Sequence, residues 1–185
     1  HLINASVVHR VNAVYTKSCR PFFYIGLEGE AESIQPAEIL HGIKKDGVLC
    51  FFSAFEIYKL TTQFAPYYHI AELKDICKKT TGHAAQFNII KEPIKSRDAL
   101  GSKEIIYNDI PYYLTRRDEK NVIYVKNLDI RGAKVKIVSM EQCLVDCFLY
   151  DIKSGGINII TEVWETAVNY LEQNIMLNIL IKLNS

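Results

Sequence analysis

The sequence predicts an α+β fold, in which a mixed, largely antiparallel sheet is packed by helices and followed by a helical C-terminal third. Residues 67–138 contain short runs rich in β-branched and aromatic side chains, separated by turn residues. From residue 139 onward, apolar residues recur at intervals of three and four, which is the period of an amphipathic helix. A chain of 185 residues, 49% of them hydrophobic, is long enough to bury a sizeable core.

The first segment, residues 1–35, is interpreted as N-terminal strands or a linker. Two apolar runs, residues 6–15 and 22–25, predict strands with a turn between them. The main domain is expected to occupy residues 36–185.

Two helices are predicted at the start of the main domain. Pro36 suits the first turn of a helix that Asp46-Gly47 should end. Ser53 and Glu56 have the spacing of a capping box, so a second helix is expected to continue to about Thr62.

Six short runs in the middle of the chain predict the strands of the sheet: residues 67–71, 86–90, 104–107, 110–115, 122–125 and 133–138. The last run alternates apolar residues with lysine, which is typical of a strand with one face in water. Residues 116–121 lie between two runs and are rich in charge, so they are interpreted as a hairpin tip.

The C-terminal third is predicted to be helical. Ser139 and Gln142 again have capping-box spacing, and Gly155-Gly156 follows where a left-handed cap or loop is expected. A second helix is predicted from about residue 159 to residue 171. A third apolar stretch, residues 175–183, is expected to pack against it.

The cysteine pattern favours reduced thiols. Five cysteines are scattered among mostly apolar neighbours, as expected in a reducing cytoplasm. Cys143 and Cys147 share a helical face, but no histidine pair or second cysteine pair completes a zinc site, so both are expected in the core. No phosphate-binding glycine motif, signal peptide or spanning apolar run occurs, so we predict a cytoplasmic protein with no metal, cofactor or membrane partner.

Local charge is the more informative signal, because the whole chain carries a net charge of only +1. Residues 116–136 contain seven basic and three acidic side chains, a local excess of +4, whereas residues 139–185 carry −4. This asymmetry predicts a basic sheet face that contacts DNA phosphates while an acidic helical layer faces away; a solvated surface without a partner is an equal alternative. The DNA-contact candidates are Arg116, Arg117, Lys120, Lys126, Arg131, Lys134 and Lys136.

Two other functions stay open. Asp109, Asp118 and Lys120 resemble the carboxylates and lysine of a small metal-dependent nuclease. Alternatively, the chain is a protein-interaction module with a surface of tyrosines, Tyr112, Tyr113 and Tyr124.

The order of two motifs resembles the C-terminal domain of AbiEi-type antitoxins over roughly residues 36–172. One is Val135-Lys-Ile-Val-Ser-Met-Glu-Gln-Cys-Leu-Val-Asp-Cys-Phe, followed by Ser154-Gly-Gly-Ile157; the family has Glu-Arg-Thr-Leu-x-Asp here. Glu141, Leu144 and Asp146 match, whereas Gln142 and Cys143 replace the arginine and threonine. The other is Phe52-Ser-Ala-Phe-Glu-Ile-Tyr-Lys-Leu-Thr-Thr62, which is similar to the family's Ser-Ala-Leu-x-x-x-Gly-Leu-Thr helix, with Lys59 in place of glycine.

The resemblance implies a non-enzymatic bacterial antitoxin and transcriptional autorepressor of a type IV toxin–antitoxin (abortive infection) system. Such a protein opposes a nucleotidyltransferase-like toxin without forming a stable complex, and promoter DNA is its expected partner. Family members read DNA through an N-terminal winged helix. Residues 1–35 do not read as one, so we expect it either upstream of His1 or absent from this member.

Overall fold

The computed structural model describes residues 8–17, 19–25, 34–75 and 100–183. The predicted strand at residues 86–90 lies outside these ranges, as does Cys77, one of the five cysteines. Within them, the strands are β1 (Val8–Arg10), β2 (Val14–Tyr15), β3 (Phe23–Ile25), β4 (Val48–Leu49), β5 (Tyr68–Lys74), β6 (Ser102–Tyr107), β7 (Ile110–Asp118), β8 (Val125–Ile130) and β9 (Ala133–Val138). The helices are α1 (Pro36–Ile43), α2 (Phe52–Tyr58), α3 (Met140–Leu149), α4 (Ile157–Ala167) and α5 (Gln173–Leu183), with short 3-10 turns η3 (Glu119–Asn121), η4 (Asp151–Ser154) and η5 (Val168–Tyr170).

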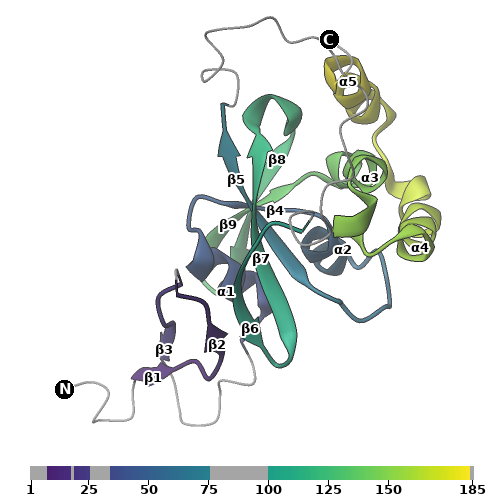
Figure 1. The fold of residues 1–185 in the computed structure, drawn as a ribbon. Coiled ribbons are helices and arrows are strands. Elements are labelled where there is room, and N and C mark those ends of the chain that lie inside the picture. The colour runs from purple at the N-terminus through teal and green to yellow at the C-terminus, as the bar shows by residue number, and fades with distance from the viewer. Residues whose placement is uncertain (1–7, 18, 26–33, 76–99, 184–185) are drawn as a thin grey trace, which may run out of the picture.

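A seven-stranded mixed sheet forms the centre of the molecule, in the order β2-β6-β7-β5-β4-β9-β8. Only β5 with β7 and β4 with β9 run parallel; the other neighbours are antiparallel. The predicted α+β class, with a largely antiparallel sheet and a helical C-terminal third, is therefore confirmed. Figure 1 shows α1 on one side of the sheet and α3, α4 and α5 on the other.

The N-terminal segment is divided between two sheets. β1 and β3 pair antiparallel as a separate ribbon, from Val8 opposite Ile25 to Arg10 opposite Phe23. β2 instead pairs with β6 at the edge of the main sheet. Val11, which lies between β1 and β2 in the chain, is 3% exposed and belongs to the core.

The path between β7 and β8 differs from the prediction. Residues 116–121 are not a hairpin tip, because β5, β4 and β9 separate β7 from β8 in the sheet. The predicted strand at residues 122–125 is also wrong, since η3 precedes it and β8 begins only at Val125. The alternation in β9 is confirmed: Val135 and Ile137 are buried, whereas Lys134 and Lys136 are exposed.

The helix ends follow some of the predicted signals and not others. Pro36 is the first residue of α1, and the Ser139 hydroxyl accepts a hydrogen bond from the Gln142 backbone N–H at 3.2 Å to cap α3, both as predicted. The capping box at Ser53 is wrong: α2 begins at Phe52 and ends at Tyr58, and the Ser53 hydroxyl accepts from the His69 N–H at 2.7 Å. The helix does not extend to Thr62 because Lys59 adopts the left-handed conformation, at φ 55°.

The C-terminal helices form a layer behind α3. Gly155 has φ 87° and caps η4 as expected, and a Cβ there would lie 2.5 Å from the Ile159 side chain. α5 packs mainly on α3 rather than on α4, which corrects the predicted neighbour. No helix within the described part of the chain is long and apolar enough to cross a membrane.

Candidate functional site

Arg117 of β7 is buried, so it is withdrawn from the predicted DNA contacts. Its Nη1 and Nη2 donate to Asp146 Oδ2 and Oδ1 at 2.5 and 2.6 Å, and the two side chains are 2% and 0% exposed. Burial alone would lower the pKa of Arg117, but the Asp146 carboxylate outweighs it and raises that pKa above its usual range. This bidentate pair ties α3 to the sheet.

The surroundings of the pair hold both partners in place. The Gln142 amide donates to Asp146 Oδ1 at 3.0 Å, while Gln142 Oε1 accepts the Ile123 N–H at 3.1 Å. The guanidinium carbon of Arg117 lies 5.3 Å from the Phe51 ring centre, within the range of a cation–π contact. Asp146 therefore pairs with a strand residue, Arg117, and with Gln142 of its own helix.

The six remaining DNA-contact candidates are exposed, but they do not form the single basic face that we predicted. Lys134 lies opposite Asp129 in the β8–β9 ladder, so a carboxylate stands beside it on the same face. Lys126 lies opposite the buried Ile137 and therefore belongs to the other face. Arg131, in the turn between the strands, is 3.8 Å from the Glu38 carboxylate.

Arg116 instead belongs to a cluster that the sequence did not reveal, which we call the Glu72 cluster: Lys44, Glu72, Lys74 and Arg116. Glu72 Oε1 is 2.7 Å from Lys44 Nζ, and Oε2 is 2.9 Å from Lys74 Nζ and 3.7 Å from Arg116 Nε. Hydrogen bonds from Lys44 and then Lys74 lower the pKa of Glu72 to about 2. Three cations surround the Glu72 carboxylate, while Asp46 and Glu119 line the same hollow as Lys44 and Glu72.

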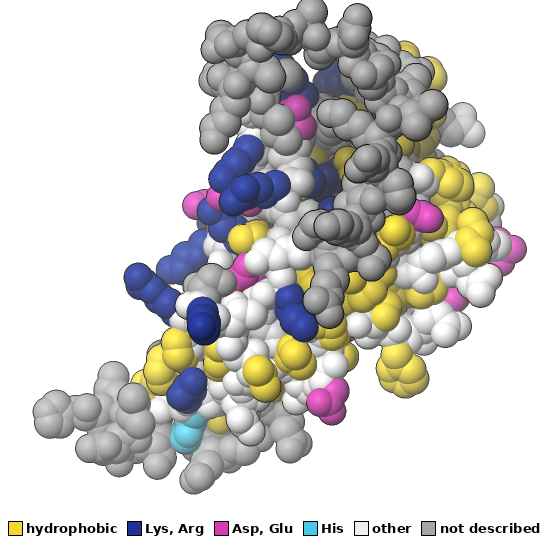
Figure 2. Space-filling model, in the orientation of Figure 1, with side chains coloured by type: hydrophobic (Ala, Val, Ile, Leu, Met, Phe, Trp, Pro, Cys, Tyr) yellow, Lys and Arg dark blue, Asp and Glu magenta, His cyan; other side chains and the backbone are white. Residues whose placement is uncertain are grey.

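The cluster lies where α1, β5 and β7 meet. Glu72 and Arg116 are register partners in the parallel β5–β7 pair, and Lys44 directly follows α1. The Lys74 and Arg116 side chains are 48% and 74% exposed, which leaves them open to a solvent-borne anion. Figure 2 shows Lys and Arg side chains gathered on the side of the molecule that carries α1 and β5, with few acidic groups among them. In the sequence, only the alternation of Glu72 with Lys74 on one strand pointed to this cluster. The other two members, Lys44 and Arg116, come from distant segments of the chain.

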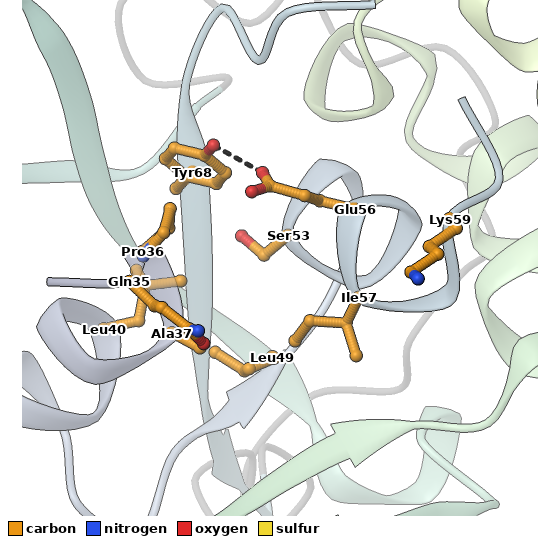
Figure 3. Close-up of a pocket in the computed structure, with 10 residues that line it drawn as sticks. All are labelled: Gln35, Pro36, Ala37, Leu40, Leu49, Ser53, Glu56, Ile57, Lys59 and Tyr68. Carbon is orange, nitrogen blue, oxygen red and sulfur yellow. Dashed lines mark hydrogen bonds between the residues drawn. The ribbon is translucent and has the colours of Figure 1, made fainter. Parts of the chain in front are cut away.

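A pocket of about 360 Å³ lies between α1, α2 and β5 (Figure 3). Its walls are mainly apolar, from Pro36, Leu40, Leu49 and Ile57, and the Tyr68 hydroxyl donates to the Glu56 carboxylate across it. Burial and this bond raise the pKa of Tyr68. The titratable lining residues are Glu56, Lys59 and Tyr68, and the lining includes no histidine, cysteine or second carboxylate.

The proposed nuclease carboxylates do not come together. Asp109 lies in the turn before β7 and Asp118 is the last residue of that nine-residue strand, so roughly 30 Å separate them. Asp118 Oδ1 accepts the Lys120 N–H at 3.1 Å as the cap of η3. In the part of the chain that the structure describes, no three His, Cys, Asp or Glu side chains gather as a metal site.

The cysteines and the central histidine are packed groups. Cys50, Cys143 and Cys147 are free and buried, and burial raises the pKa of Cys147 to about 12. His69 is 0% exposed, its Nε2 lies 2.9 Å from the Leu100 carbonyl, and burial lowers its pKa to about 3. These thiols and this imidazole are closed to solvent, as the core assignment of Cys143 and Cys147 predicted.

Of the three tyrosines proposed as an interaction surface, Tyr112 is buried. Tyr112 is 2% exposed, and its ring centre lies 5.1 Å from that of Tyr68. Tyr113 and Tyr124 are only partly exposed. Most of the exposed large hydrophobic side chains in the described ranges lie in the C-terminal third instead.

No model of a known protein family matches this chain, and no curated protein matches it either.

Proposed function

We propose that the protein is an AbiEi-type antitoxin and transcriptional autorepressor of a bacterial type IV toxin–antitoxin system. It acts in the cytoplasm without catalysis and opposes a nucleotidyltransferase-like toxin without a stable complex. One observation carries the proposal: the two segments of the resemblance, far apart in sequence, pack together. The Tyr58 hydroxyl on α2 donates to the Val138 carbonyl of β9 at 2.8 Å, and the Cys143 thiol lies 3.9 Å from the Phe51 carbonyl.

The matching motif residues have architectural places in this arrangement. Glu141 is 2% exposed and its Oε1 accepts the Glu172 N–H at 3.3 Å, while Asp146 anchors Arg117. Gln142 stands where the family has arginine, and its side-chain amide donates to Asp146. The positive charge beside Asp146 is that of Arg117 on β7. Asp146 therefore has a basic partner although residue 142 is not arginine.

The exposed cations support the regulatory half of the proposal. The Glu72 cluster offers Lys74 and Arg116 on a rigid sheet, with Glu72 holding them close together. Lysine and arginine side chains placed in this way bind DNA phosphates and release counterions, so affinity falls with salt. This cluster replaces the single basic face over residues 116–136 as the proposed contact with promoter DNA.

Co-expression with the toxin encoded beside this gene tests the antitoxin role. Induction of the toxin alone should arrest growth, and induction of both proteins should restore it. An Asp146→Ala chain, which loses the Arg117 anchor, should fail to restore growth, while the exposed Asp46→Ala chain should succeed. Growth arrest that persists with abundant, folded wild-type protein contradicts the proposal.

A further inference from the structure

The C-terminal helices expose an apolar surface. Of thirteen large hydrophobic side chains that are exposed in the described ranges, nine lie within residues 148–181. Figure 2 shows hydrophobic side chains spread over the side of the molecule that carries α3, α4 and α5. Contiguous apolar surface of this kind marks interaction sites in soluble proteins.

A groove runs between η5 and α5 within this surface; we call it the α5 groove. It encloses about 320 Å³ and is lined by Val168, Leu171, Gln173, Met176, Leu177 and Leu180. Leu177, Leu180 and Ile181 form an i, i+3, i+4 stripe along α5 and are 56%, 47% and 57% exposed. Among the α5 residues, only Ile179 is buried.

Two exposed carboxylates, Glu165 and Glu172, lie near the η5 side of the α5 groove in the chain, and α5 itself carries one lysine, Lys182. No lysine or arginine occurs between Lys153 and Lys182. Glu172 lies in the chain between two lining residues, and Glu165 is three residues before Val168 on the same side of the helix. Glu141 Oε1 accepts the Glu172 N–H at 3.3 Å, and its buried Oε2 has no hydrogen-bond partner. Two exposed carboxylates therefore flank, in the chain, the segment that forms the η5 side of the groove.

We propose that the α5 groove binds an amphipathic helix of a partner protein, one with leucine-like anchors and Lys or Arg beside Glu165 and Glu172. Apolar anchors at i, i+3, i+4 and i+7 fill grooves of this type, and basic flanks complement the carboxylates. A second copy would bring the same carboxylates against this one, and an anionic membrane would be repelled in the same way. The inference stands independently of the proposed function.

Fluorescence anisotropy with two synthetic helices tests the proposal. One labelled peptide of about 14 residues has a leucine stripe with lysines on its flanks, and the other has the same stripe with glutamates. The Leu/Lys peptide should bind one site, at least about tenfold more tightly than the Leu/Glu peptide. Leu177→Asp should weaken its binding by about tenfold or more, whereas Val14→Asp, an exposed apolar residue on β2, should leave binding unchanged.

Reversing the charges beside the groove distinguishes specific binding of the peptide from nonspecific hydrophobic binding. Glu165→Lys with Glu172→Lys should remove the preference for the Leu/Lys peptide, while Glu119→Lys, exposed on η3, should keep it. Equal binding of both peptides, or of neither, overturns the proposal. Self-association in sedimentation velocity that Leu177→Asp abolishes, or binding to anionic vesicles through the same residue, also overturns it, because another occupant then covers the groove.

Discussion

Asp146 on α3 accepts two hydrogen bonds from the guanidinium of Arg117 on β7, a residue 29 positions earlier in the chain. Both side chains are withdrawn from water, and Asp146 also accepts from Gln142. The pair therefore joins the helical layer to the centre of the sheet. Asp146, which matches the family motif in the sequence, has a structural role here.

Removing one partner of this pair should be strongly destabilising. Asp146→Ala leaves a buried guanidinium without its counterion, and we expect a loss of about 3–5 kcal/mol in the free energy of unfolding, measured by urea denaturation. Asp46→Ala, at an exposed site after α1, should cost less than about 0.5 kcal/mol. Replacing both partners, as Arg117→Met with Asp146→Leu, should recover much of the loss. A cost below about 1 kcal/mol for Asp146→Ala contradicts the buried pair.

Ser53 should matter as an acceptor for β5 rather than as a helix cap. Ser53→Ala leaves the buried His69 N–H without its partner, so we expect a loss of about 1–3 kcal/mol in the free energy of unfolding. Amide hydrogen exchange locates the effect: the His69 amide should lose protection, while the first turn of α2 should keep it. The reverse pattern would support the capping box.

Stability should rise with pH through the titration of His69. Its folded pKa, about 3, lies below the value of 6.5 for an unperturbed histidine, so between these values the unfolded state binds the extra proton. The free energy of unfolding should increase by at most about 1.4 kcal/mol per pH unit. Glu72, with a pKa lowered to about 2 from 4.5, acts mainly below pH 5, so it contributes little to the slope between pH 5 and 6.5. An unchanged slope there in His69→Gln contradicts this assignment.

Local signals in the sequence were sufficient for much of the fold. The alternation in β9, the Ser139 cap and the glycines after η4 depend on neighbours within a few residues, and each has its predicted role. The prediction of a hairpin between β7 and β8 was wrong, because the order of strands in a sheet depends on pairings that no local pattern encodes.

The site was less predictable for the same reason. Arg117 stands in a run of charged residues and looked solvated, but a partner on α3 compensates its burial. The Glu72 cluster joins three segments through the register of β5 and β7, so its members could not be selected from local charge excess.

We propose that the exposed cations around Glu72 contact DNA phosphates, while the motif residues hold the fold. The most direct test measures the affinity for a duplex of the promoter upstream of this gene across a salt series. Lys74→Ala with Arg116→Ala should reduce the slope of log affinity against log salt by about 0.9 for each lost phosphate contact, whereas Lys17→Ala with Lys103→Ala should leave it unchanged. Equal slopes and affinities for the cluster variant and the wild type would contradict the claim.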